Sequence, residues 1–241
     1  MTNIKFSRKE LEKEIKLTKE VLEKISLFGT PLEKAGKNEI ELEIFPNRPD
    51  LIPIGGFIRG FKAFLGKETG LKKYEIHKPE KDYKVKIDSS VKSVRPFTVC
   101  AIVKNLNLDE EKIKSIVDLQ EKLHITIGRN RKRAAIGIYP LEKIKLPIGY
   151  EAKKPTDIKF RPLGFDKELD GLQILQRHPA GKEYSHLLNN QDKFPVFIDA
   201  DKKILSMPPI TNSEAAGKID TNTKEVFIEC SGHDIRVLKK V

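Results

Sequence analysis

Residues 194–210 read Phe-Pro-Val-Phe-Ile-Asp-Ala-Asp-Lys-Lys-Ile-Leu-Ser-Met-Pro-Pro-Ile. Two short apolar runs, at 194–199 and 204–207, flank a polar stretch, which is the pattern of a β-hairpin. Two consecutive prolines directly after the second run force an extended, rigid turn. Strands and helices do not alternate regularly along the rest of the chain. The sequence therefore predicts a mixed-sheet α+β fold rather than a doubly wound one.

The first third of the chain has the pattern of short helices followed by a strand–turn–helix unit. Ser7 begins a capping-box pattern, and Thr18 is placed to cap a second short helix. Isoleucine and leucine alternate with glutamate over 40–44, which predicts a half-buried strand. Apolar residues at helical spacing over 54–65 predict a helix. We expect a small N-terminal α/β domain over residues 1–82.

A lysine-rich stretch at 67–90 carries only scattered apolar residues and is the expected domain boundary. Beyond it, we expect a larger mixed-sheet α+β domain over residues 88–241. Its expected elements are a strand at 97–103, a helix begun by Asp109 with Ile113, Ile116, Val117 and Leu123 on one stripe, a strand at 134–139, a short helix near 166–176 and a strand at 225–230.

The composition limits the class of protein. The 241 residues include 46 basic and 35 acidic ones, and this net charge of +11 favours a polyanionic partner such as nucleic acid. No window is apolar enough to span a membrane, and the N-terminus lacks the apolar segment of a signal peptide. The two cysteines, Cys100 and Cys230, sit in apolar runs, which suits small core residues in a reducing compartment. We therefore expect a cytoplasmic protein.

Missing motifs argue against several kinds of catalytic site. No two histidines have the spacing of a metal-binding pair on a helix, and no Cys-x-x-Cys occurs, so no metal site is expected. A Gly-x-Ser-x-Gly nucleophile turn is absent, which argues against a serine hydrolase. No glycine-rich phosphate loop is followed by Lys-Ser or Lys-Thr, so ATP-driven chemistry is not expected within this chain.

Residues 128–133 form a strongly basic turn. Its candidate RNA-binding residues are Arg129, Arg131, Lys132 and Arg133. Clustered arginines neutralise a nucleic-acid backbone and bind its phosphates bidentately. The same residues also fit a solvated hairpin tip, and the sequence alone favours neither interpretation.

Polar side chains gather near the Pro-Pro turn and on the last predicted strand. Asn212, Ser213 and Glu214 follow the turn closely. Glu229 and Ser231 are two residues apart on the strand and therefore share one face. A carboxylate inside an apolar strand is costly unless it is solvated or hydrogen-bonded. Glu229 is thus either a functional acid or an acid at a sheet edge that faces water.

Five blocks of sequence occur in an informative order, namely Asn47-Arg-Pro-Asp-Leu51, Asp118-Leu-Gln-Glu-Lys-Leu123, the run 128–137, Gly181-Lys-Glu-Tyr-Ser-His-Leu187 and Leu205-Ser-Met-Pro-Pro-Ile210. Together they resemble the N-terminal half of the β subunit of phenylalanyl-tRNA synthetase, in its archaeal and eukaryotic form. The resemblance covers nearly the whole chain. It implies that the larger domain is an editing domain, which hydrolyses tyrosine wrongly attached to the phenylalanine tRNA.

The same resemblance implies the partners and cofactors of a whole enzyme. The partners would be tRNA(Phe) and an α subunit, in an α2β2 assembly whose aminoacylating centre lies in the α subunit. ATP and Mg²⁺ would serve that whole enzyme, and no cofactor is expected in this region.

The resemblance also implies roles for five residues. Of these, Ser206, Asn212, Glu229 and Ser231 are expected to take part in catalysis, and Phe197 is expected to bind substrate. Apart from the resemblance, we also expect Ser213 and His186 to bind substrate. Glu229 would hydrogen-bond the phenol of tyrosine, and Ser206 and Asn212 would bond the ester or the terminal ribose. Ser231 would hold the Glu229 carboxylate or a water molecule. Phe197 would form an apolar wall where relatives often have leucine.

The expected reaction is attack by water on the aminoacyl ester, without a metal or a covalent intermediate, driven mainly by proximity. His186 is the best candidate among the histidines for a base. Two other functions remain open, a non-catalytic tRNA- or subunit-docking module and a freestanding editing deacylase. Because the chain stops soon after a strand, we expect it to be a piece of a longer chain.

Overall fold

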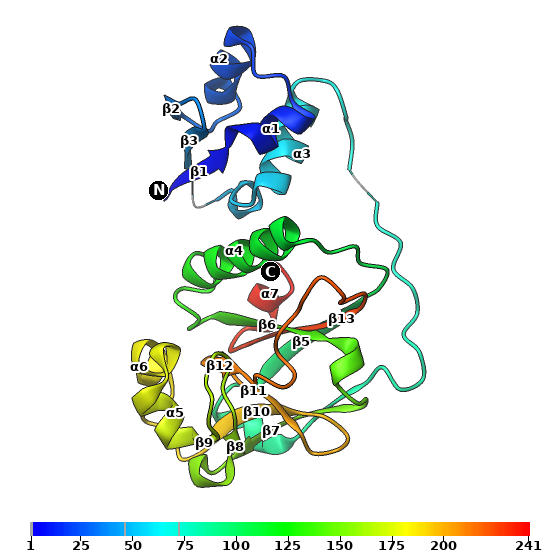
Figure 1. The fold of residues 1–241 in the computed structure, drawn as a ribbon, viewed down its shortest axis with the longest axis vertical. Coiled ribbons are helices and arrows are strands. Elements are labelled where there is room, and N and C mark those ends of the chain that lie inside the picture. Colours follow the sequence, from blue (N-terminus) through cyan, green and yellow to red (C-terminus); the bar gives the residue numbers. More distant parts are fainter. Residues whose placement is uncertain (1, 46, 72) are drawn as a thin grey trace. The chain divides into compact units, whose positions relative to one another are not determined.

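The computed structural model describes residues 2–45, 47–71 and 73–241. The chain divides into two units, Met1–Ile76 and His77–Val241, which run from blue to cyan and from cyan to red in Figure 1. Each unit has its own sheets and its own buried core. The α+β class predicted from the sequence is confirmed.

The sheet of unit 1 has three antiparallel strands in the order β1-β3-β2. They are β1 (Thr2–Ser7), β2 (Leu32–Ala35) and β3 (Glu39–Ile44). The strand predicted at 40–44 is confirmed, because Ile40, Leu42 and Ile44 are buried and the glutamates between them are partly exposed. The sequence does not predict β1, whose alternation rests on two buried residues alone, Ile4 and Phe6.

Two helices of unit 1 begin where the capping signals predict, α1 (Arg8–Glu14) and α2 (Lys19–Leu27). The 3-10 turn η1 (Pro49–Leu51) and α3 (Ile54–Phe64) begin without a side-chain cap. The side-chain oxygens of Ser7 and Thr18 each accept a hydrogen bond at 3.3 Å from the backbone N–H three residues further on. On α3, Phe57 and Phe61 are fully buried in a core that the helices share with the sheet.

Unit 2 contains a five-stranded mixed sheet in the order β12-β11-β10-β7-β4. Its strands are β4 (Val85–Ile87), β7 (Ile148–Lys153), β10 (Phe194–Ile198), β11 (Ile204–Met207) and β12 (Thr211–Asn212). The predicted hairpin is confirmed, with Phe197 opposite Ser206. The pair β4–β7 is parallel and the other pairs are antiparallel. Residues 85–87, which the expected boundaries place in neither domain, therefore belong to the sheet of unit 2.

A second sheet of unit 2 has three antiparallel strands in the order β5-β13-β6. They are β5 (Phe97–Val103), β6 (Ala134–Pro140) and β13 (Val226–Gly232). All three strands were predicted, and β13 is the central one. Cys230 on this central strand is buried, whereas Cys100 on the edge strand β5 is exposed. The expectation that both cysteines are core residues is thus wrong for Cys100.

One core lies between the two sheets of unit 2. Tyr139 and Phe227 reach it from the three-stranded sheet, and Tyr150, Phe197 and Leu205 reach it from the five-stranded sheet. The rings of Tyr150 and Phe197 stack with their centroids 4.3 Å apart. Because both sheets bury large side chains in this core, their relative position is well determined by packing.

Helices and short turns surround these sheets. They are η2 (Ser89–Ser93), α4 (Glu110–Ile125), η3 (Leu141–Lys143), η4 (Pro155–Asp157), α5 (Gly171–Arg177), α6 (Pro179–Tyr184), η5 (Ser185–Leu187) and α7 (Ile235–Leu238). The helix predicted near 166–176 begins only at Gly171, where Asp170 forms a capping box with Gln173. The preceding residues instead form β9 (Leu169–Asp170), which pairs with β8 (Lys159–Phe160).

Helix α4 covers the open edge of β6 with polar side chains. Gln120 Nε2 donates to the Ile136 carbonyl at 2.6 Å, and the Ile136 N–H donates to His124 Nε2 at 2.8 Å. These two bonds satisfy backbone groups that an edge strand would otherwise leave unpaired. Val117, one of the four residues of the predicted apolar stripe, is 47% exposed, so the prediction is wrong for this residue. His124, which is not part of the predicted stripe, is only 3% exposed.

No helix among the described residues is long and apolar enough to cross a bilayer.

Candidate functional site

A cavity of about 270 Å³ lies in unit 2 beside the turn that follows β11. Its wall is formed by Val117, Gln120, Glu121 and His124 of α4, by Arg131, by Ala135, Ile136 and Ile138 of β6, by Leu163, His178 and Ala180, by Ser206, by residues 208–212, by Gly217 and Ile219, and by Glu229 of β13. Apolar and polar side chains from segments far apart in the sequence thus meet at one place. A concave site with a few polar groups among apolar ones is the usual form of a ligand pocket.

Glu229 is the acid of this cavity. It lies on the central strand of its sheet and is 2% exposed, so the interpretation as a sheet-edge acid that faces water is wrong. Burial raises the pKa of its carboxyl group to about 8, although the nearby Arg95 guanidinium favours the charged form. Its Oε2 atom has no hydrogen-bond partner among the described residues.

The hydroxyl of Tyr139 connects the polar residues on this side of the cavity. It lies 2.8 Å from Ser206 Oγ, 3.3 Å from Glu229 Oε1 and 3.4 Å from Asn212 Oδ1. A phenol has one proton, so it donates to one of these acceptors at a time. Ser206, Asn212 and Glu229, which the sequence singles out, are therefore brought together around a tyrosine that the sequence does not single out.

Gly137 makes room for this cluster. It lies directly opposite Glu229 in the sheet. A Cβ atom at this position would overlap the Tyr139 hydroxyl and lie 2.6 Å from Glu229 Oε1. Tyr139 and Glu229 can therefore approach each other closely only because residue 137 is a glycine.

Ser231 lies behind the cavity rather than in its wall. It is fully buried, and its hydroxyl accepts a hydrogen bond from Arg95 Nε at 3.1 Å. Arg95 also donates from Nη2 to the Ser231 carbonyl at 2.6 Å and to the Arg131 carbonyl at 3.2 Å. The buried arginine therefore ties β13 to the basic turn and places a positive charge near Glu229.

The three remaining residues expected to bind substrate do not line the cavity. Phe197 is fully buried in the core between the sheets, where it stacks on Tyr150. Ser213 is also buried, and its hydroxyl accepts a hydrogen bond at 3.2 Å from the Ala216 N–H. His186 is exposed, with Nδ1 3.2 Å from the Glu183 carbonyl.

The basic turn is a tight connection between α4 and β6, not a hairpin tip. Arg129, Asn130 and Arg131 have φ angles of 48°, 52° and 63°, which place three consecutive residues in the left-handed region. Arg129 and Lys132 are exposed and Arg133 is partly exposed.

The side chain of Arg131 is turned into the protein. Its Nη1 donates to the Ile210 carbonyl at 2.8 Å, and its Nη2 donates to Glu121 Oε1 at 3.0 Å. Its guanidinium carbon lies 4.5 Å from the centre of the Tyr184 ring. The guanidinium therefore binds protein groups in the wall of the cavity.

No group of three or more His, Cys, Asp or Glu side chains within the described part of the chain is arranged to hold a metal ion.

The structure matches the crystal structure of an N-terminal fragment of the phenylalanyl-tRNA synthetase β-subunit from Pyrococcus horikoshii, with a TM-score of 0.89 and 38% sequence identity. The match covers 98% of this chain and 70% of that one. The chain belongs to the phenylalanyl-tRNA synthetase β-subunit family.

Curated relatives agree with this assignment. The phenylalanine–tRNA ligase β subunit of Thermococcus kodakarensis is 44% identical over 189 residues, which are 78% of this chain and 32% of the relative. That of Methanothrix thermoacetophila is 36% identical over 236 residues, which are 97% of this chain and 43% of the relative. The chain thus spans less than half the length of these relatives. No protein-family model matches the chain.

The sequence does not predict the positions of three side chains in or next to the cavity, those of Tyr139, Arg131 and His178. Tyr139 lies in a predicted strand, but nothing in its spacing shows that its hydroxyl meets Glu229. Arg131 was assigned to RNA, because its place in a run of basic residues does not show that it turns inward. His178 stands just before Pro179 with no partner histidine, and only the fold brings it to the cavity.

Proposed function

We propose that this cavity hydrolyses the ester between tyrosine and tRNA(Phe), and so removes the wrong amino acid from the phenylalanine tRNA. The observation that carries this proposal is the position of Glu229. It is a buried carboxyl group of a residue that lines the cavity, and one of its oxygens has no hydrogen-bond partner among the residues that the structure describes.

An editing site solves a problem of recognition. A hydrophobic pocket rejects an analogue with one added hydroxyl by only about 10²-fold. A synthetic site that accepts phenylalanine therefore admits some tyrosine. A second site that rewards the added hydroxyl removes the product that the first site fails to exclude.

Glu229 supplies the group that rewards the hydroxyl. Its Oε1 lies 3.3 Å from the Tyr139 hydroxyl, and its Oε2 is buried without a hydrogen-bond partner among the described residues. The charged carboxylate would accept a hydrogen bond from the phenol, and the protonated acid would donate one to the phenol oxygen. Both forms would therefore bind tyrosine better than phenylalanine. Because the pKa of Glu229 is about 8, the protonated acid prevails at neutral pH. A hydrogen bond between neutral groups contributes roughly 0.5–1.5 kcal/mol, or about a 2- to 12-fold preference.

The size of the cavity fits an aromatic side chain. An apolar cavity of about 150 Å³ holds a benzene molecule. The cavity beside Glu229 has about 270 Å³, which leaves space for a phenol ring and part of the attached ester. Water would attack that ester without a metal or a covalent intermediate, with the bound geometry supplying proximity.

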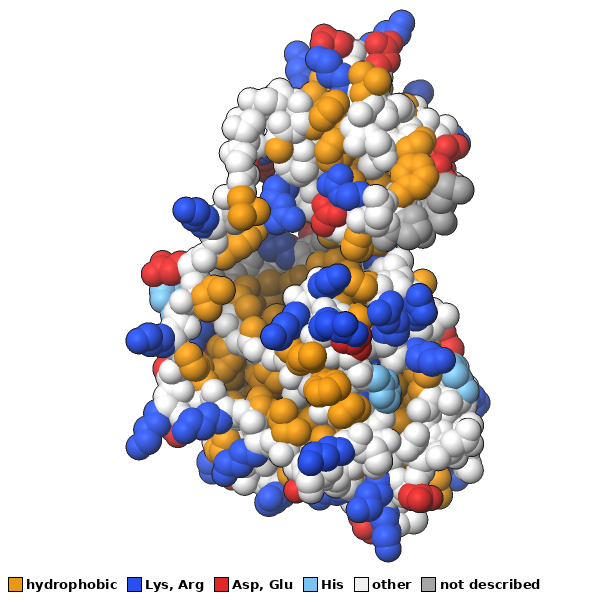
Figure 2. All heavy atoms as spheres, turned by 180° about the vertical axis from the view of Figure 1, so that it is seen from behind, with side chains coloured by type: hydrophobic (Ala, Val, Ile, Leu, Met, Phe, Trp, Pro, Cys, Tyr) orange, Lys and Arg blue, Asp and Glu red, His pale blue; other side chains and the backbone are white. Residues whose placement is uncertain are grey.

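Positive charge supports the binding of tRNA. The turn that leads to the cavity wall contains Arg129, Lys132 and Arg133, and we propose that these three residues contact phosphates. Arg131 of the same turn would position the turn against the cavity wall. Figure 2 shows basic side chains among apolar ones over one face of unit 2. Phosphate neutralisation by lysine and arginine provides most of the affinity of such surfaces.

The whole enzyme of the proposal is larger than this chain. The α subunit would carry the aminoacylating centre in an α2β2 assembly, and ATP and Mg²⁺ would act there. The proposal places this assembly in the cytoplasm, where tRNA is charged. Hydrolysis would belong to the expected domain 88–241 rather than to the expected domain 1–82.

One observation favours a second candidate, a non-catalytic tRNA- or subunit-docking module. The Tyr139 hydroxyl lies within 3.4 Å of acceptors on Ser206, Asn212 and Glu229, so part of the polar wall is satisfied by the protein itself. A docking module would retard tRNA on a gel and leave the ester intact.

Deacylation of tyrosyl-tRNA(Phe) and of phenylalanyl-tRNA(Phe) separates these functions. We expect the chain to hydrolyse the tyrosyl ester faster, and Glu229→Ala to lower the ratio of the two rates roughly 2- to 12-fold at neutral pH. Glu225→Ala is the matched control, since Glu225 precedes the same strand and does not line the cavity. If the ratio of tyrosyl to phenylalanyl deacylation rates is unchanged in Glu229→Ala, Glu229 does not recognise the tyrosine hydroxyl. If the chain retards tRNA on a gel but leaves the ester intact, the docking function is favoured.

A further inference from the structure

Arg95 is a buried cation that joins several segments of unit 2. It follows η2 and is 2% exposed. Its backbone carbonyl accepts a hydrogen bond from the Tyr150 hydroxyl of β7 at 2.7 Å. Its guanidinium donates to Ser231 of β13 and to the Arg131 carbonyl in the turn between α4 and β6. These contacts hold the guanidinium at one place behind the cavity wall.

The oxygens that the guanidinium binds carry no charge. They are the Ser231 hydroxyl at 3.1 Å, the Ser231 carbonyl at 2.6 Å and the Arg131 carbonyl at 3.2 Å. A charge that is removed from water is costly unless an opposite charge accompanies it. Glu229 is the carboxyl group whose charge acts on Arg95. Arg95 and Glu229 are therefore partners in charge although they do not bond each other directly.

Ser231 lies between these partners along β13. It shares one face of the strand with Glu229. Because a guanidinium only donates, the Ser231 hydroxyl is the acceptor in its bond with Arg95. Ser231 and Arg95 both favour the charged form of the Glu229 carboxyl group, against its burial. The contact of Arg95 with Ser231 thus reaches the acid of the cavity.

Four other ionisable groups lie close enough to Glu229 to feel its charge. They are Tyr139, Tyr150, Cys100 and Cys230. Burial raises the pKa of both cysteines to about 12, and it raises the pKa of both tyrosines above 10. All four groups are therefore neutral between pH 6.5 and pH 9. Among the described residues, Arg95 is the charged group that acts on Glu229 in this range.

The cavity wall holds further ionisable residues, namely Glu121, His124, Arg131 and His178. The bond to His124 lowers the pKa of Glu121, and burial lowers the pKa of His124, so neither changes its charge above pH 6.5. Arg131 is always protonated. An experiment that reads the Glu229 carboxyl group itself is needed to separate its ionisation from that of His178.

Resting on the proposed hydrolysis, we propose that Arg95 is a positioning residue for the recognition of tyrosine: it holds the segment of Glu229 and Ser231 in place and stabilises the ionised form of Glu229. Arg95 does not line the cavity, so it acts through these two residues. An ionised carboxylate makes a stronger hydrogen bond than a neutral acid. The charge of Arg95 therefore strengthens the bond between Glu229 and the phenol.

The size of this effect depends on pH. Glu229 has a pKa of about 8, so its ionised fraction and the preference for the tyrosyl ester rise together as the pH increases through 8. We expect a preference about 5- to 10-fold higher at pH 9 than at pH 6.5. Without the charge of Arg95, the effect of burial is less opposed and the pKa of Glu229 is higher still. The rise in preference then begins at a higher pH.

Two measurements on the 241-residue chain test this role. NMR of a chain labelled with ¹³C at the glutamate carboxyl groups follows the ionisation of Glu229, whose signal is the one missing in Glu229→Gln. The ratio of tyrosyl- to phenylalanyl-tRNA(Phe) deacylation is measured at the same pH values, after subtraction of spontaneous hydrolysis. Arg95→Gln removes the charge and Arg95→Lys keeps it. Arg177→Gln is the matched control at an exposed arginine that does not line the cavity.

The charge-removing variant is expected to differ from the other two. In Arg95→Gln, the midpoint of the Glu229 titration should move upward by about one pH unit or more, and the tyrosine preference at pH 8.5 should fall about 2- to 5-fold. In Arg95→Lys and Arg177→Gln, the midpoint should stay close to that of the wild type. A Glu229 midpoint that is the same in Arg95→Gln as in the wild type, or that moves equally in Arg95→Lys, would overturn the proposal.

A second variant carries the test if Arg95→Gln does not fold. Ser231→Ala lacks the hydroxyl but keeps the carbonyl that binds Arg95, and its Glu229 midpoint should also move upward. A wild-type midpoint in Ser231→Ala would then overturn the proposal.

Failure of the proposed function has a different signature. A wild-type chain that leaves both esters intact would overturn the hydrolysis and the role of Arg95 in it, whatever the Glu229 signal does. A wild-type chain that prefers the tyrosyl ester, with the same dependence on pH in Arg95→Gln, would overturn the role of Arg95 alone.

Discussion

The Tyr139 hydroxyl lies 2.8 Å from Ser206 Oγ, and this bond joins the two sheets of unit 2. Tyr139 belongs to β6 of the three-stranded sheet and Ser206 to β11 of the five-stranded sheet. Both side chains are almost completely buried. The polar wall of the cavity is therefore built at the contact between two sheets rather than on either one alone.

Tyr139→Phe is expected to destabilise unit 2 by about 1–3 kcal/mol, because Ser206 and Glu229 lose a buried partner. Urea unfolding followed by circular dichroism measures this loss. Tyr74→Phe is the control, since Tyr74 is 66% exposed and its bond to Arg59 is on the surface. Equal effects of the two changes would contradict a structural role for the Tyr139 hydroxyl.

Gly137→Ala is expected to lower stability and to disturb recognition of tyrosine together. The added methyl would overlap the Tyr139 hydroxyl and crowd Glu229, and relief of this overlap requires movement of a buried side chain. Thermal unfolding and the ratio of tyrosyl to phenylalanyl deacylation are the measurements. Gly55→Ala meets nothing within 4 Å and is expected to leave both unchanged. A Gly137→Ala variant as stable as the wild type would show that the cluster is not tightly packed.

The pH dependence of stability tests the burial of Glu229. Its pKa is raised from 4.5 to about 8 in the folded chain, so the folded state binds more protons than the unfolded state between these values. Stability that protonated Glu229 provides is present below pH 4.5 and is lost as the pH rises to about 8. Relative to Glu229→Gln, the wild type should lose up to about 1.4 kcal/mol per pH unit in this window. If the difference in free energy of unfolding between the wild type and Glu229→Gln were the same at pH 5 and at pH 8.5, the raised pKa of Glu229 would be contradicted.

The contribution of His124 to stability is expected to change with pH in the opposite direction, decreasing as the pH falls. Burial lowers its pKa below 6.5, and its Nε2 must be unprotonated to accept from the Ile136 N–H. Stability from this contact is therefore present above pH 6.5 and is lost as the pH falls below it. Hydrogen exchange of the Ile136 amide, corrected for intrinsic rates, should accelerate as the pH falls from 6.5 towards the acid unfolding of the wild type. Exchange that stays equally protected over this whole range would contradict this account.

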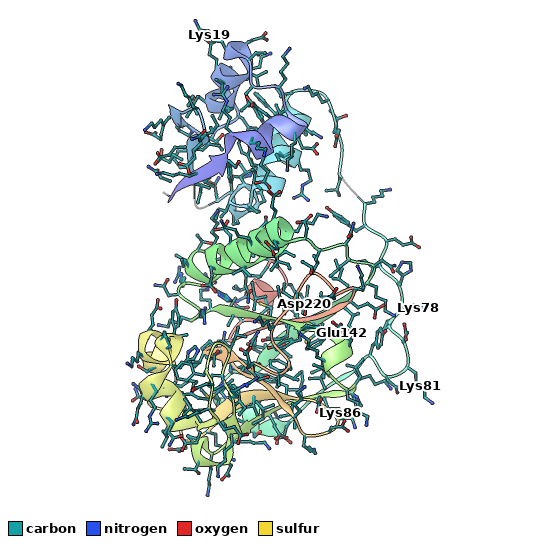
Figure 3. The ribbon with its side chains drawn as sticks, in the orientation of Figure 1. Lys19, Lys78, Lys81, Lys86, Glu142 and Asp220 are labelled. Carbon is teal, nitrogen blue, oxygen red and sulfur yellow. The ribbon has the colours of Figure 1, made fainter. Side chains whose placement is uncertain are left out.

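The basic turn predicts the salt dependence of tRNA binding. Each phosphate contact contributes about 0.7–0.9 to the slope of log K against log salt. Joint replacement of Arg129, Lys132 and Arg133 by alanine should therefore reduce the slope by about 2–3. The control replaces the exposed Lys78, Lys81 and Lys86, of which Lys78 and Lys81 point away from the body of unit 2 in Figure 3. An equal loss in the control would place the RNA elsewhere.

Elements with local signals were predictable from the sequence. The caps at Ser7 and Thr18 act within three residues, and the hairpin at 194–207 is a property of neighbouring residues. The strand β7 was missed although Ile148, Tyr150 and Ala152 alternate with less buried residues. That alternation is the signal that would have predicted it.

The cavity was only partly predictable, because its polar groups come from distant segments. Glu229 is recognisable as an acid in an apolar strand, and Asn212 follows a rigid turn. The inward direction of Arg131 depends on a left-handed turn and on carbonyls about 80 residues later in the chain. His178 meets the cavity only through the bond to Leu163. Such long-range contacts leave no trace in local spacing.

The two bonds from α4 to Ile136 have a consequence for self-association. Gln120 and His124 are one helical turn apart, so a single turn shields the backbone of β6 from other chains. If that turn unwound, β6 would offer free N–H and C=O groups to another molecule, which is how domain swapping and fibre growth begin. A ligand that entered the cavity by lifting α4 would expose these backbone groups, whereas entry past the loop 208–212 would leave them covered.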